Sequence, residues 1–129
     1  MSDRGGAAVL LVGVAAVVLL LAAALGAVGA YLLARVEAVA AADAAALAAA
    51  PVTFLPFGAE GTPTEEAARF ATANGARLLS CVCPVDPSWE PRTVTVRVAR
   101  EARLWPVGLL TVTAVGRAEF LPALLLTEE

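Results

Sequence analysis

The stretch that decides the fold is Gly5–Ala34, GGAAVLLVGVAAVVLLLAAALGAVGAYLLA, which contains no charged side chain. A bilayer hydrocarbon core of roughly 30 Å needs about 20 apolar residues, so this stretch can cross it with residues to spare. Tyr31 lies one turn before Arg35, where an interfacial aromatic residue is expected. We therefore predict a transmembrane helix over residues 7–34.

A cleaved secretory signal is the alternative interpretation of this stretch, although the apolar core of such a signal normally has only 7–15 residues. For a span, we expect residues 1–6 to form a short cytoplasmic N-terminus and the rest of the chain to lie outside the cell membrane. Gly26 and Ala30 have the small-xxx-small spacing of helix–helix interfaces, and we treat them as candidate packing residues.

The composition agrees with a membrane protein that is not an enzyme. The 129 residues are 60% hydrophobic and only 16% charged, against about 25% charged residues in a soluble chain. The net charge of −3 argues against a nucleic-acid partner, and the absence of His removes Ser–His and Cys–His dyads and His-based metal sites. We expect no catalytic, cofactor-binding or metal-binding residue, no cofactor and no small-molecule substrate; the expected partners are the lipid bilayer and other membrane proteins.

The helix is not expected to end at the membrane. Residues 35–50 are rich in Ala, the best helix former, and nothing breaks the run before Pro51. We predict an extracytoplasmic continuation whose Val36, Val39, Asp43, Leu47 and Ala50 share roughly one face. Asp43 is either a solvated carboxylate or, with Leu47, a polar register mark in an interface between subunits.

After a connector at residues 51–61, the pattern predicts a small α+β domain at 62–129. Thr62, Pro63 and Glu65 form a capping-box start, and Gly75 a stop, for a short helix over 63–74. Three strands are predicted by apolar runs and by alternation: Leu78–Cys83, Arg92–Arg100 and Leu109–Phe120. We expect these strands to form an antiparallel sheet backed by the short helix and the long helix.

The two indoles of this domain, Trp89 and Trp105, are expected to fill its core, since buried aromatic residues dominate small cores. If they are exposed instead, their loops could recognise an envelope ligand. The C-terminal tail begins with the apolar stretch Leu121–Leu126 and ends with Glu128 and Glu129. We expect this tail to pack on the domain or to touch the membrane surface.

Cys81 and Cys83 are the only cysteines. In an extended strand their Cα atoms would lie about 7 Å apart, at the limit for a disulfide. Free thiols, a local or intermolecular disulfide, and a thiol-redox pair remain open, and the redox pair would make the chain a membrane-tethered redox protein.

Two stretches resemble the TadE/TadG-like proteins of tight-adherence (Flp) pilus systems. The first is Arg4-Gly5 before the apolar helix with Arg35 and AADAAALAAA at 41–50, and the second is ATANGARLLSC at 71–81. The closest likeness is to the short TadE-like proteins of high-GC Gram-positive bacteria. Val39 stands where the family usually has Gln, and Thr62, Thr64 and Glu65 occupy the region where many members have a further Cys.

The resemblance implies a non-catalytic, pseudopilin-like component of a pilus or related secretion assembly, with pilus membrane proteins or pilins as partners. It also raises the question of prepilin-peptidase processing after Gly5 or Gly6; the alternative is that these two glycines only fray the start of the helix. Such processing favours Glu at the fifth position after the cut, where this chain has Leu10 or Leu11.

Overall fold

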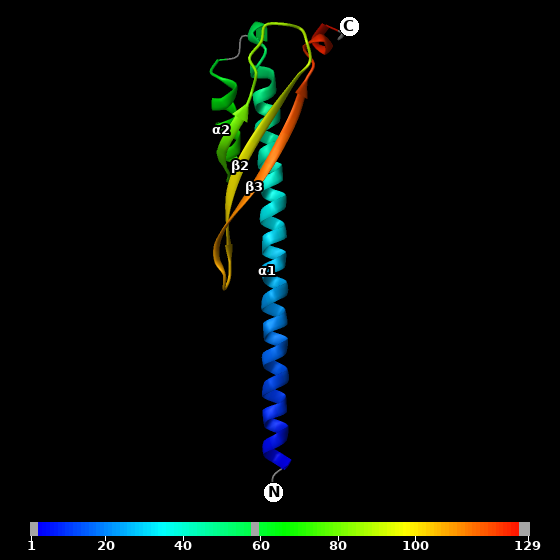
Figure 1. Cartoon of the computed structure of the whole chain (residues 1–129), viewed down its shortest axis with the longest axis vertical. Coiled ribbons are helices and arrows are strands. Elements are labelled where there is room, and N and C mark those ends of the chain that lie inside the picture. Colours follow the sequence, from blue (N-terminus) through cyan, green and yellow to red (C-terminus); the bar gives the residue numbers. More distant parts are fainter. Residues whose placement is uncertain (1–2, 58–59, 127–129) are drawn as a thin grey trace.

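The computed structural model describes residues 3–57 and 60–126, and Figure 1 shows one long helix with a small domain beside its C-terminal half. The helix α1 runs from Asp3 to Val52, followed by a 3-10 turn at Leu55–Phe57 and the helix α2 at Pro63–Ala73. The strands are β1 (Arg77–Val82), β2 (Arg92–Leu104) and β3 (Gly108–Phe120), and a second 3-10 turn spans Pro122–Leu126. Gly58 of the predicted connector and Glu128 and Glu129 of the predicted tail lie outside the described residues.

α1 is one uninterrupted rod of 50 residues. It passes the predicted stop at Pro51 and ends at Val52, because a proline in the last turn removes only one hydrogen bond. Thr53 closes the helix: its hydroxyl Oγ1 and its backbone N both donate to the Ala50 carbonyl, at 2.6 and 3.2 Å. The apolar and the Ala-rich halves therefore form a single element.

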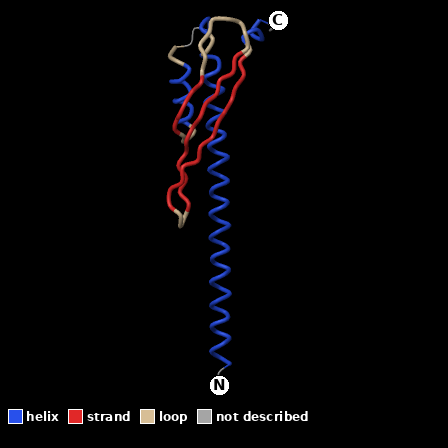
Figure 2. The backbone as a smooth tube through the Cα atoms, in the orientation of Figure 1, coloured by secondary structure: helices blue, strands red, loops and turns tan. Residues whose placement is uncertain are grey.

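The three strands form an antiparallel sheet in the order β1-β2-β3, and the α+β fold class predicted from the sequence is confirmed (Figure 2). β2 and β3 pair along their full length, from Arg92 opposite Phe120 to Leu104 opposite Gly108. They are longer than predicted, because the hairpin continues through Glu101–Leu104, where the alternating pattern is weaker. β1 pairs only with the Thr95–Ala99 part of β2, so the far end of the hairpin is a two-stranded ribbon.

The core lies between the sheet and an alanine-only face of α1. Alanines recur at three- and four-residue spacing along this face, and the valines of β2 lie against them; the fully covered residues are Ala38, Ala41, Ala42, Ala45, Ala46, Ala49, Val94, Val96 and Val98. Small side chains let the strands approach the helix closely. At Gly116 a Cβ would overlap the Ala42 carbonyl and would lie 2.7 Å from the backbone N of Asp43.

α2 packs against α1 and β1 and has the predicted capping box. The Glu65 N–H donates to Thr62 Oγ1 at 3.2 Å, and the Thr62 N–H donates to Glu65 Oε2 at 2.8 Å. Gly75 follows the helix with a φ of +71°, as expected for a C′ glycine. Arg100 of β2 donates to the Asn74 carbonyl at 2.9 Å and forms an ion pair with Glu37 of α1 at 2.8 Å, so it joins three elements.

The end of the domain beside the C-terminus of α1 is closed around the buried Arg92. Its guanidinium donates to the backbone carbonyls of Thr53, Asp86, Ser88 and Glu90, and it lies 5.6 Å from the Phe54 ring centroid. The Ser88 backbone N–H donates to the Asp86 carboxylate at 2.7 Å, which lowers the pKa of that carboxyl group. Arg92 thus holds the 84–91 loop against the end of α1.

The expectation that both indoles fill the core is wrong. Trp89 packs edge-on against Phe54 at 4.9 Å but remains 47% exposed, and Trp105 is 79% exposed at the turn between β2 and β3. The core is instead built from alanine and valine, because the close approach of α1 to the sheet leaves no room for an indole between them.

Candidate functional site

The outward face of α1, which we define as Val36, Val39, Asp43 and Leu47, lies opposite the sheet. All four side chains are exposed, whereas five of the seven alanines between Val36 and Leu47 are buried under the domain. Ala50, which was predicted to belong to this face, is instead buried, because it lies at the end of α1, where the chain turns and Thr53 donates to the Ala50 carbonyl. The remaining residues form a mostly apolar surface with one carboxylate, outside the predicted span.

Gly26 and Ala30, the other candidate packing residues, are exposed and lie on a different side of the rod. At about 100° per residue, they are rotated about 100° from Asp43 and Leu47 respectively. A straight neighbouring helix therefore could not contact both pairs. The outward face continues into the apolar half through Leu32, Gly29 and Leu25, which are also exposed.

Gly5 and Gly6, the candidate processing residues, lie in the first turns of α1. A Cβ at either position would meet no atom within 4 Å, so the surface around both is open. Processing at these glycines stays a prediction.

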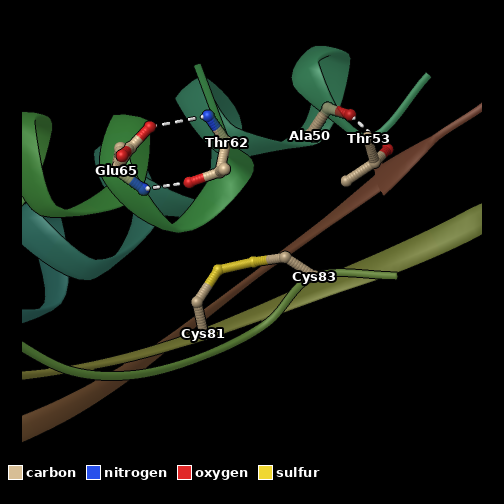
Figure 3. Close-up of a disulfide and its surroundings, with 6 residues drawn as sticks. All are labelled: Ala50, Thr53, Thr62, Glu65, Cys81 and Cys83. Atoms are coloured by element: carbon tan, nitrogen blue, oxygen red, sulfur yellow. Dashed lines mark hydrogen bonds between the residues drawn. A yellow bond between two sulfur atoms is a disulfide. The ribbon is translucent and has the colours of Figure 1, made fainter. Parts of the chain in front are cut away.

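Cys81 and Cys83 are joined by a disulfide in the structure, with their Cα atoms 5.4 Å apart (Figure 3). The separation is shorter than in an extended strand because β1 ends at Val82, so the chain bends between the two cysteines. A register shift between Leu78 and Ser80 turns both Leu78 and Cys81 toward the core. The bridge is therefore partly buried at the margin of the core, and Arg77 lies at the opposite end of β1.

The described residues offer little that could hold a small ligand or a metal ion. They contain no group of three or more His, Cys, Asp or Glu side chains that could hold a metal ion. In this part of the chain there are two open, shallow depressions: one is lined by Glu37, Asn74 and Arg100, and the other by Arg77 and Glu101.

α1 is the one helix in the described part of the chain that is long and apolar enough to cross a membrane. Its most apolar 18-residue window has no part buried inside the molecule, unlike the core helix of a soluble protein. The fold thus defines a single-pass membrane protein whose anchor is continuous with the spine of an α+β domain.

Comparison with protein families finds a match within this chain. Residues 5–52 match the family described as putative Flp pilus-assembly TadE/G-like. The match covers nearly all of α1, so this segment is TadE/G-like and the resemblance seen in the sequence is confirmed there. It does not extend to ATANGARLLSC, and nothing supports the narrower likeness to high-GC Gram-positive proteins. No curated protein and no solved structure matches the chain significantly.

Proposed function

We propose that this chain is a non-catalytic, pseudopilin-like component of a tight-adherence (Flp-type) pilus or related secretion assembly. In this proposal the N-terminus is cytoplasmic, α1 crosses the membrane, and the α+β domain lies outside. The outward face of α1 packs against another membrane protein or pilin of the assembly. The observation that carries the proposal is the exposure of this face on the helix that matches the pilus-assembly family.

The chemistry of the outward face suits a helical partner. Val36, Val39 and Leu47 offer apolar surface that neither the domain nor, above Arg35, the lipid would cover. Asp43 lies among them, and a lone carboxylate in an apolar helix interface fixes register at some cost in stability. The absence of His and of a metal-binding cluster among the described residues accords with a structural role.

Site-specific photo-cross-linking in cells that assemble the pilus tests this proposal. A photoreactive amino acid at Leu47 should give an adduct with a pilus membrane protein or a pilin, identified by mass spectrometry. Val82 is the matched control, since it is 65% exposed against 66% for Leu47 but lies on the sheet. Adducts at Val82 but none at Leu47 would place the contact on the sheet and overturn the role of the outward face.

The alternative, a membrane-tethered thiol-redox or envelope-binding protein, depends on Cys81 and Cys83 or on the tryptophan loops. A redox cysteine normally has a cation nearby that lowers its pKa, whereas Arg77 lies at the far end of β1. If the Cys81→Ser, Cys83→Ser double variant assembles pili normally, the redox interpretation fails and the assembly role stands.

A further inference from the structure

The β2–β3 hairpin points back toward the membrane, alongside the apolar half of α1. Figure 1 shows its turn well below the rest of the domain, beside the upper part of the blue-to-cyan rod. The turn carries the sequence LWPVGLL at residues 104–110, which contains no charged side chain. Trp105 and Val107 are 79% and 73% exposed, and Leu109 is also exposed. This uncharged turn, residues 104–110, is called the hairpin tip below.

Two contacts fix the height of the hairpin tip along α1. Arg100 is paired with Glu37, and five strand residues at about 3.3 Å each carry the chain about 16 Å further, the length of about 11 helix residues. Gly116 contacts Ala42, and the eight residues to Gly108 span about 26 Å, or about 17 helix residues. The two estimates place the tip at most as far down as residues 25–26.

The exposure pattern of α1 gives the same height independently. From Gly5 to Ala22 every residue is exposed, and partial cover begins at Ala23 and continues at Ala27 and Tyr31. These three residues lie in line with the buried alanines of the core face. The domain therefore reaches down the helix to the level of residues 23–31, inside the predicted span.

The hydrocarbon core cannot extend to the end of that span without enclosing part of the hairpin. If the core ended at Ala34, the tip near Gly26 would lie about 12 Å below its surface. Arg103 and the open edges of a two-stranded ribbon would then enter the hydrocarbon, where an unpaired backbone group costs several kcal/mol. If the core instead covers residues 7–26, these 20 residues match its thickness of about 30 Å.

We infer that the hydrocarbon core covers about residues 7–26 of α1, and that the hairpin tip rests in the outer lipid interface with Trp105 among the headgroups. Trp and Tyr favour this layer, and Tyr31 lies about 8 Å further along α1, toward the water side of the interface. Arg103 then lies just above the tip, at the level of the lipid phosphates. The bilayer is thus a second docking surface of the domain, and this inference depends on the proposed membrane span.

The test uses the full-length protein in phosphatidylcholine vesicles at a high lipid-to-protein ratio. The Trp89→Phe variant leaves Trp105 as the single indole, and Trp105→Phe leaves Trp89 as the matched control. The acrylamide quenching constant of Trp105 should be at least about twofold lower than that of Trp89. Lipids brominated near the headgroup should quench Trp105. Trp89 should respond to acrylamide and not to brominated lipid.

Several outcomes would overturn the inference. Equal acrylamide quenching of the two indoles, without quenching by brominated lipid, would place the tip in water. Stronger quenching by deeply brominated lipid would place it in the hydrocarbon. Shielding of Trp105 that appears only after pilus proteins are added would assign the tip to a protein partner. Extraction of the protein by alkaline carbonate would instead contradict the span itself, and with it the proposed function.

A second pair of variants, made in the Trp89→Phe background, tests lipid contact of the hairpin tip independently of the comparison between the two indoles. Val107→Glu places a charge in the tip and should raise acrylamide quenching of Trp105 about twofold, because the tip is lifted from the interface. Val82→Glu, at a similarly exposed valine on β1, should leave it unchanged. Equal acrylamide quenching of Trp105 in the two variants would contradict contact of the hairpin tip with lipid.

Discussion

At Gly116 the backbone of β3 lies directly against the backbone of α1, and no other residue type fits without displacement. A Cβ there would overlap the Ala42 carbonyl, although the φ of this glycine is unremarkable for a strand. The glycine is therefore required by close approach and not by backbone conformation.

We predict that Gly116→Ala lowers the free energy of unfolding by about 1–3 kcal/mol, the usual cost of overpacking a core. Thermal unfolding in detergent, followed by circular dichroism, measures the change. Gly13→Ala is the control, because a Cβ at Gly13 meets nothing within 4 Å. Equal melting temperatures for the two variants would show that α1 and β3 are not in contact.

Arg92 has a comparable role at the distal end, where its guanidinium serves four backbone carbonyls. Arg92→Ala should cost about 2–3 kcal/mol, because it leaves buried carbonyls unpaired. Arg92→Lys should retain part of this stability, since a lysine keeps the charge but lacks the planar fork.

Thermal unfolding of the Arg92 variants, with exposed Arg97→Ala as the control, checks this prediction. A loss as large in Arg97→Ala as in Arg92→Ala would contradict a specific role for the buried guanidinium.

At the scale of elements, the sequence was sufficient where local chemistry determines structure. The capping box of α2, its glycine stop and the inward valines of β2 all follow from local pattern. The core face of α1 could not be predicted, because hydrophobic periodicity carries no information on a helix that is apolar on every side. In the structure the alanines of α1, and not Val36 and Leu47, face the sheet, and Gly116 permits their close approach.

The placement of the tryptophans could not be predicted for a related reason. Aromatic residues indicate a core in a chain surrounded by water, but this domain lies beside an apolar anchor. Trp105 occupies an uncharged turn at the level of that anchor, and the pairing of Glu101–Leu104 with β3 that carries it there is a tertiary feature.

The short bridge between Cys81 and Cys83 closes only a very small loop, so we predict a small stabilising effect. The Cys81→Ser, Cys83→Ser double variant should lose about 1–2 kcal/mol of unfolding free energy. Intact mass without reductant should show the loss of two hydrogens relative to the reduced chain. A full pair of alkylatable thiols in the native protein would contradict the bridge.

At the scale of the whole molecule, the proposed topology predicts opposite fates for tags at the two ends of the chain. A protease added to intact protoplasts or spheroplasts should remove a C-terminal epitope and leave an N-terminal one until the membrane is lysed. Immunoblots of the two tagged forms measure this. The reverse pattern would put the domain in the cytoplasm, where the glutathione pool would also oppose the disulfide.

The unbroken course of α1 from Asp3 to Val52 has a mechanical consequence. No hinge separates the anchor from the folded part, so a rotation of the buried end about its axis turns the sheet by the same angle. Any subunit that grips the anchor within the bilayer therefore also sets the direction in which the exposed domain points. In the proposed topology, a rotation imposed on α1 on one side of the bilayer would therefore reorient the domain on the other side.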